Sequence, residues 1–138
     1  MKIAVNKCYG GFSLSYDAMK RLSELKGYKI YCYRQTKYNY KDGIDEYKKI
    51  DIPNKNDLFI YYFSEDLGET TNELRGQLLS QSDIIRNDPD LIQVIEELGN
   101  KANGKCANIR VVDIPDDINW EIEEYDGSEW ISECHRTW

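Results

Sequence analysis

The segment NKCYGGFSLS, residues 6–15, combines residue types that bind anions where a strand meets a helix. The free N–H groups and partial positive charge at a helix N-terminus attract anions. Gly10 and Gly11 would let an oxyanion approach the backbone, and the hydroxyls of Ser13 and Ser15 could donate hydrogen bonds to it. The spacing matches neither GxGxxG nor the P-loop pattern. A tight corner that packs a strand on its helix is therefore the competing interpretation.

The stretch GYKIYCYRQTKYNYK, residues 27–41, is a second candidate, with five tyrosines, four cations and no acid. Aromatic faces stack on bases, and lysine and arginine neutralise phosphates. Tyrosine is also common in strands, so part of the set formed by Tyr28, Tyr31 and Tyr33 must face a core. The residues alone leave both roles open for Tyr31 and Tyr33.

The C-terminal residues HRTW, 135–138, are the third candidate. Arg136 could grip a carboxylate or phosphate through its planar guanidinium, or pair with the acidic residues before it. Trp138 could stack on a ligand or cap a core, whereas a lone histidine such as His135 is usually structural. We expect His135, Arg136 and Trp138 to pack near the glycine joint of the same chain or of a partner chain in a homo-oligomer.

No catalytic set stands out in the sequence. There is no HExxH, no GxSxG, and no Cys–His pair within a recognisable local motif. Cys8, Cys32, Cys106 and Cys134 are widely spaced, which favours reduced thiols over disulfides or structural zinc. We therefore expect a binding protein without catalytic residues, metal or cofactor.

Length and composition are typical of a single globular domain over residues 1–138, with 41% hydrophobic and 31% charged residues. No apolar run approaches the roughly 20 residues of a membrane span, and the first residues do not resemble a signal peptide. We therefore expect a cytoplasmic protein without a membrane partner.

The charge of the chain is unevenly distributed. The net charge of the whole chain is −7. Residues 113–138 hold nine acids and one base, whereas residues 1–112 hold sixteen acids and seventeen bases. A duplex-DNA binder needs a basic footprint, so duplex nucleic acid is not expected as a partner. The acidic end is interpreted either as a solvated strand face or as an imitation of nucleic acid.

The first half of the chain predicts strands around one helix. KIAVNKC (2–8) alternates as a strand, Ser15 caps a helix that Gly27 ends, and YKIYCYR (28–34) follows as a second strand. This order could form a right-handed crossover with parallel strands. LFIYYF (58–63) predicts a buried strand, while residues 64–87 are ambiguous.

The second half predicts a helix, a strand and a hairpin. Asp88 and Pro89 begin a helix that closes at Gly104, and CANIRVVDI (106–114) is a strand. Asp126-Gly127 favours a two-residue type I′ turn. In that register Ile122 faces Ile131, Trp120 faces Glu133, and Trp130 points to the other side. The predicted fold class is α/β, with α+β as the alternative, in a single compact domain with a mixed β-sheet, two main helices and a C-terminal β-hairpin.

Three blocks of the chain resemble a widespread group of small phage and prophage proteins. They are NKCYGGFSLS, RNDPDLIQVIEELGNKANG and DIPDDINWEIEEYDGSEWISECHRTW, whereas residues 35–80 match nothing in that group. The group is similar in protein size and genomic setting to phage anti-defence proteins that sequester nucleotide immune signals, such as cyclic ADP-ribose isomers and cyclic dinucleotides. The functional residues that this resemblance carries over to the chain are those that match the motifs of the group: Asn6, Gly10, Gly11, Phe12, Ser13, Ser15, Arg86, Asp88, Tyr125, His135, Arg136 and Trp138.

The resemblance implies a phage-encoded protein of the infected bacterial cytoplasm that binds a nucleotide signal without catalysis. Together with Tyr31 and Tyr33, the carried-over residues other than Asp88 and Tyr125 make up the predicted ligand site. An acidic protein-interaction inhibitor or DNA mimic that blocks a host defence protein is the alternative, and a hydrolase of the same signals is a third hypothesis. A salt titration separates the first two, because a charge mimic loses its target as salt rises.

Overall fold

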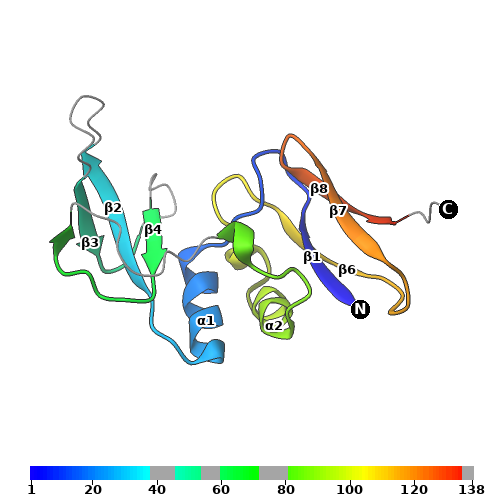
Figure 1. The fold of residues 1–138 in the computed structure, drawn as a ribbon, viewed down its shortest axis with the longest axis horizontal. Helices are drawn as coiled ribbons and strands as arrows, with labels where there is room; N and C mark the ends of the chain where they lie inside the picture. The colour runs from blue at the N-terminus through cyan, green and yellow to red at the C-terminus, as the bar shows by residue number, and fades with distance from the viewer. Residues whose placement is uncertain (38–45, 54–59, 72–80, 135–138) are drawn as a thin grey trace.

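The computed structural model describes residues 1–37, 46–53, 60–71 and 81–134 of the chain. Figure 1 shows two helices side by side in the middle, a sheet on one side of them and two strand pairs on the other. The helices are α1 (Tyr16–Lys26) and α2 (Pro89–Leu98), with 3-10 turns η1 (Gln81–Asp83) and η2 (Gly99–Ala102). The strands are β1 (Lys2–Asn6), β2 (Tyr31–Lys37), β3 (Glu46–Ile50), β4 (Ile60–Phe63), β5 (Thr70–Thr71), β6 (Ile109–Asp113), β7 (Trp120–Tyr125) and β8 (Ser128–Glu133).

The α+β form of the predicted fold class is confirmed, with two main helices and a C-terminal hairpin. The expected mixed sheet takes another form, because the described strands lie in three sheets: β1–β6, β4–β2–β3–β5 and β7–β8. All ladders in the described part of the chain are antiparallel. The prediction of a parallel crossover is therefore wrong. β1 pairs with β6, whereas β2 pairs with β3 and β4, so β1 and β2 lie on opposite sides of the helices (Figure 1).

Helix α1 begins and ends where the sequence predicts. Ser15 is extended at the N-cap, and its hydroxyl oxygen accepts a hydrogen bond from the Ala18 N–H at 3.2 Å. Gly27 has φ +81° and ends the helix, with its N–H directed at the carbonyls of Ser23 and Glu24. A residue with a side chain resists that conformation, which explains the glycine.

Helix α2 begins as predicted but ends earlier. The Asp88 carboxylate accepts the Asp90 N–H at 2.9 Å, and Pro89 takes the first helical position. The last α-helical residue is Leu98, so the predicted end at Gly104 is wrong. The chain tightens into η2 instead, which places Ala102 in the core with no exposed surface.

The main core lies between the helices and the two groups of strands. It joins Leu22 of α1 and Val94 of α2 to Tyr62 of β4 on one side and to Ala4 of β1 on the other. A second, aromatic cluster covers the opposite face of the β2–β3–β4 sheet. It consists of Tyr33, Tyr47 and Phe63, with Tyr31, Tyr61 and Leu67 packed against it.

The hairpin β7–β8 packs beside β1, on the side of the β1–β6 pair away from the helices (Figure 1). Ile3 and Val5 are fully buried and, by strand alternation, point opposite to Ala4, toward the hairpin. The predicted hairpin is confirmed: Asp126 and Gly127 form the loop with φ +51° and +89°. The predicted register is confirmed as well, with Ile122 opposite Ile131 and Trp120 opposite Glu133.

None of the helices in the described ranges has the length and apolar character that crossing a membrane requires.

Candidate functional site

Asn6 is the first residue of the predicted glycine joint, residues 6–15, and its side chain connects the joint to two other segments. Its side chain is fully buried, and its Nδ2 group donates to the carbonyls of Cys8 at 2.6 Å and Gly127 at 2.7 Å. Its Oδ1 accepts the Asn108 N–H at 2.9 Å and the Cys8 N–H at 3.4 Å. One amide therefore ties together the end of β1, the loop before β6 and the hairpin turn. Both Nδ2 hydrogens are engaged within the chain, which indicates a structural role.

Arg86 joins the segment before α2 to the hairpin. Its Nη1 and Nη2 donate to the two carboxylate oxygens of Glu129 at 2.7 and 3.0 Å, and Nη1 also reaches the Ala4 carbonyl at 3.3 Å. Both side chains are largely buried, with 15% of Arg86 and 9% of Glu129 exposed. The guanidinium carbon lies 3.6 Å from the centroid of the Phe12 ring. Arg86 is thus held by a carboxylate and an aromatic ring of its own chain.

The glycine joint is in backbone contact with the hairpin turn. The Gly10 N–H donates to the Asp126 carbonyl at 3.2 Å, so this N–H group already has a partner. A Cβ added to Gly10 would lie 2.8 Å from the Cβ of Cys106, and one added to Gly127 would lie 2.6 Å from the Gly10 nitrogen. Gly11 has φ +91°, but a Cβ added to it would meet no atom within 4 Å. These contacts favour the tight-corner interpretation at Gly10, while a phosphate contact at Gly11 stays a prediction.

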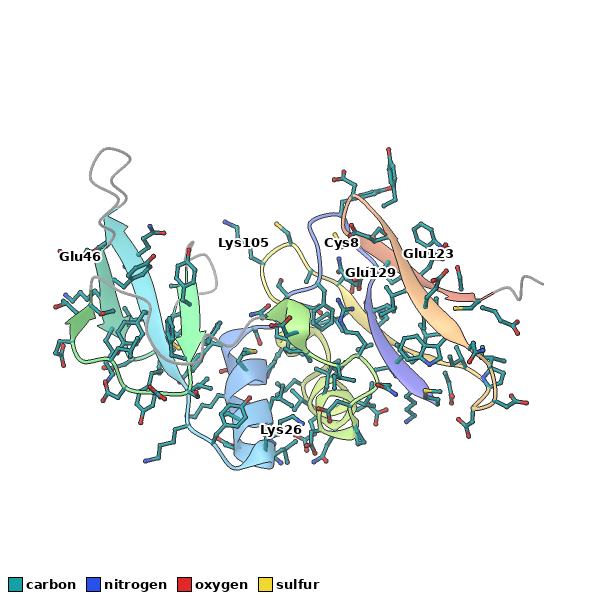
Figure 2. All side chains as sticks on the ribbon, viewed as in Figure 1. Cys8, Lys26, Glu46, Lys105, Glu123 and Glu129 are labelled. Atoms are coloured by element: carbon teal, nitrogen blue, oxygen red, sulfur yellow. The ribbon has the colours of Figure 1, made fainter. Side chains whose placement is uncertain are left out.

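The two serines of the joint hold the loop that follows α2. The Ser13 hydroxyl donates to the Lys105 carbonyl at 3.2 Å, in the loop labelled in Figure 2. The Ser15 hydroxyl donates to the Lys101 carbonyl at 2.6 Å and accepts the Ala18 N–H. Each hydroxyl has one hydrogen, so these donors are engaged by backbone carbonyls. Phosphate binding by Ser13 and Ser15 gains no support from their contacts.

Tyr31 and Tyr33 lie in β2, across the helix layer from the joint (Figure 1). Tyr33 is fully buried; its hydroxyl donates to the Gly68 carbonyl and accepts the Leu67 N–H, each at 2.8 Å. The Lys49 ammonium lies 5.1 Å from the centroid of the Tyr31 ring. The structure therefore does not bring the tyrosines together with the rest of the predicted site.

Five of the predicted site residues do converge on one place. Asn6, Gly10, Gly11, Phe12 and Arg86 lie around the hairpin turn, where Glu129 and Gly127 complete the network. The predicted contributions of His135, Arg136 and Trp138 fall outside the described residues.

The hairpin presents a second face to solvent, which we call the outer face. Its residues alternate with those that face β1: Glu121, Glu123 and Tyr125 on β7, and Ser128, Trp130 and Ser132 on β8. Tyr125 is 72% exposed and Trp130 is 41% exposed. Figure 2 shows Glu129 and Glu123 on opposite sides of the hairpin. The sequence predictions did not include this face as a site, although the predicted register already placed Trp130 on the side opposite Ile122 and Ile131.

Two hydrogen bonds fix the centre of the outer face. The indole Nε1–H of Trp130 donates to Glu123 Oε2 at 2.9 Å, and the Ser132 hydroxyl donates to the same oxygen at 2.5 Å. Trp130 and Glu123 are direct cross-strand neighbours. The exposed indole is thereby held across the strands.

Neither a cluster of metal ligands nor a disulfide is present among the described residues. No group of three histidine, cysteine, aspartate or glutamate side chains within the described ranges could hold a metal ion. Cys8, Cys32, Cys106 and Cys134 are free thiols. Burial raises the pKa of the Cys32 thiol to about 12, so this cysteine stays protonated at neutral pH.

Comparisons of the chain with protein-family models, curated proteins and solved structures found no match. Function is therefore inferred from the contacts of the chain itself, and the resemblance to phage proteins stays a prediction.

Proposed function

We propose that this chain is a non-catalytic binding protein whose β7–β8 hairpin docks on a basic surface of a partner protein. The observation that carries this proposal is the exposure of the acids in residues 113–134. This segment contains nine acids and no lysine or arginine, and every acid except Glu129 is exposed. Such a surface attracts a basic partner and accelerates their encounter.

The chain itself compensates only part of this charge. Asp113 and Asp116 pair with the N-terminal ammonium, and Glu129 pairs with Arg86. Within the described ranges, no lysine or arginine side chain lies within 4.0 Å of the other six acids, which are Asp117, Glu121, Glu123, Glu124, Asp126 and Glu133. Their charge is available to a partner.

The hairpin is also held in place, which favours binding. A two-residue loop joins its strands, Asn6 bonds to the turn, and the pair of Arg86 and Glu129 fixes β8 against the body. A binding element that is already ordered loses little conformational entropy when it docks.

The resemblance to phage proteins makes a defence protein of the bacterial host the expected partner. Sequestration of a nucleotide signal is a separate prediction that the described contacts do not favour. That prediction relied on hydrogen-bond donors of Gly10, Ser13, Ser15 and Arg86. These donors already bond to carbonyl and carboxylate oxygens of the chain.

Two variants with the same change in net charge test the proposal. The hairpin-neutral variant carries Glu121→Gln, Glu123→Gln, Glu124→Gln and Asp126→Asn. The control-neutral variant removes four exposed acids elsewhere, through Asp17→Asn, Glu65→Gln, Glu69→Gln and Asp83→Asn.

Each protein is used to capture partners from a lysate of the bacterial host, and the affinity for the captured protein is then measured at low and moderate salt. We expect one stoichiometric partner, held by the wild type and the control-neutral variant, lost by the hairpin-neutral variant, and weakened by salt. Equal binding to both variants would refute the proposal. Native mass spectrometry of protein purified from cells that make cyclic ADP-ribose isomers tests the nucleotide hypothesis, because a co-purifying ligand would favour it.

A further inference from the structure

We infer that the outer face of the hairpin receives an arginine of the partner, with Trp130 as the stacking surface and the carboxylates beside it as the counter-charge. This inference rests on the proposed function and names the chemical group that the hairpin recognises.

The chain contains an arginine held in the same manner on the other side of the hairpin. There the guanidinium of Arg86 lies 3.6 Å from the Phe12 ring centroid while both carboxylate oxygens of Glu129 accept its Nη atoms. An aromatic ring and a carboxylate together thus satisfy both the face and the edge of a guanidinium. The contacts of Arg86 with Phe12 and Glu129 therefore show which groups of this chain bind a guanidinium, and the outer face can be compared with them.

The outer face offers a ring and carboxylates without the cation. Trp130 is 41% exposed, and the Glu123 carboxylate lies at the edge of its indole, 2.9 Å from Nε1. Glu121 lies two residues along β7 on the same face, within reach of a side chain that covers the indole. Within the described residues, the cations that lie over rings are Lys49 on Tyr31 and Arg86 on Phe12, so the indole of Trp130 carries none.

The hydrogen bonds of Glu123 prepare this surface for stacking. By accepting from both Trp130 and Ser132, the carboxylate holds the indole in one orientation before a partner arrives. Tryptophan gives the strongest cation–π attraction of the aromatic side chains. Tyr125, 72% exposed and two residues from Glu123, extends the aromatic surface toward the turn.

Guanidinium fits this arrangement better than ammonium does. It is planar, so it lies flat on an indole while its N–H groups reach sideways to a carboxylate. A lysine ammonium is a compact and strongly hydrated charge that responds mainly to the field of the acids. The face should therefore prefer arginine over lysine at equal charge.

Capped hexa-arginine and hexa-lysine peptides are suitable probes, because they share charge and length. In calorimetric titrations at low salt we expect the wild-type protein to bind hexa-arginine about three- to fivefold more tightly than hexa-lysine. In ¹H–¹⁵N spectra the Trp130 indole signal, assigned by its loss in Trp130→Phe, should move with hexa-arginine and much less with hexa-lysine.

Three variants separate stacking from charge. Trp130→Leu should abolish the arginine preference and keep the affinity for hexa-lysine, whereas Trp130→Phe retains a ring and should keep most of the preference. Glu133→Gln, near the open end of the hairpin, should weaken both peptides equally.

Equal affinity for the two peptides, or an arginine preference that survives in a folded Trp130→Leu variant, would overturn the inference and leave the proposed function standing. Failure of both peptides to bind at low salt would overturn the proposed function as well.

Discussion

Glu129 of the hairpin and Arg86 of the segment that precedes α2 form a bidentate ion pair, with Nη1–Oε1 and Nη2–Oε2 distances of 2.7 and 3.0 Å. Glu129 also accepts the backbone N–H of Asn6 at 2.8 Å. Three distant parts of the sequence meet at one carboxylate, and this junction sets the position of the acidic hairpin on the body.

Breaking this pair should destabilise the fold strongly. Arg86→Met keeps an apolar stem against Phe12 but leaves the Glu129 carboxylate buried without its cation. We expect a loss of about 3–5 kcal/mol in the free energy of unfolding, measured by urea denaturation. The double variant Arg86→Met/Glu129→Gln should recover part of it, because no buried charge is left unpaired.

Arg21→Met is the matched control, since it breaks an exposed pair between Arg21 and Glu97. Its effect should be small. If Arg86→Met were as mild as Arg21→Met, the junction would not hold the hairpin.

The hairpin turn should tolerate no side chain at Gly127. Gly127→Ala adds a Cβ at φ +89° that collides with the backbone nitrogens of Gly10 and Gly11. Gly11→Ala is a control with a similarly positive φ but open space, so it carries only the conformational cost of about 1 kcal/mol. We expect Gly127→Ala to melt at a distinctly lower temperature than Gly11→Ala. Equal melting temperatures would show that joint and turn are not in contact.

The cap of α2 should make stability depend on pH. Burial raises the pKa of Asp88, but hydrogen bonds from Lys26 and from the Asp90 N–H outweigh it, so the pKa is lowered overall. A lowered folded-state pKa stabilises the protein above the unfolded-state pKa, and this contribution is lost as pH falls through the folded-state pKa. Asp88→Asn keeps a good N-cap and removes the charge.

We therefore expect Asp88→Asn to cost about 1 kcal/mol at pH 7 and nothing in strong acid, where the wild-type carboxyl is protonated as well. Urea denaturation of both proteins at several pH values checks this. A difference that stays constant down to strong acid would contradict the assignment to charge.

The cysteines should react in the order of their exposure. Cys106 is exposed, whereas Cys32 is buried and its pKa is raised to about 12. At pH 8, iodoacetamide should modify Cys106 rapidly and leave Cys32 intact until the protein unfolds. Peptide mapping by mass spectrometry reads the order, and early modification of Cys32 in the folded protein would contradict its place in the core.

Local sequence signals were sufficient for the elements that depend on neighbouring residues. Ser15 and Gly27 bound α1, Asp88 begins α2, and Asp126-Gly127 sets the hairpin register. In each case the deciding hydrogen bond or backbone conformation lies within a few residues, so the residue types reveal it.

Strand partners and the junction at Glu129 could not be predicted in this way. β1 pairs with β6 because both bury apolar residues, and no neighbouring residue marks that choice. Alternation places Glu129 on the same hairpin face as Ile131, but it places Glu124 and Glu133 there as well, and both of these stay exposed. Only the fold shows that Glu129 is the buried acid and that Arg86 is its partner.

The affinity of hexa-arginine for three proteins, measured by calorimetry at low salt, tests most directly whether the hairpin is the docking element. The hairpin-neutral variant should bind about tenfold more weakly than the wild type, and the control-neutral variant should stay within about twofold of the wild type. Equal losses in the two variants would contradict the docking proposal, because binding would then follow the net charge of the chain and not the face that Glu121, Glu123 and Trp130 form.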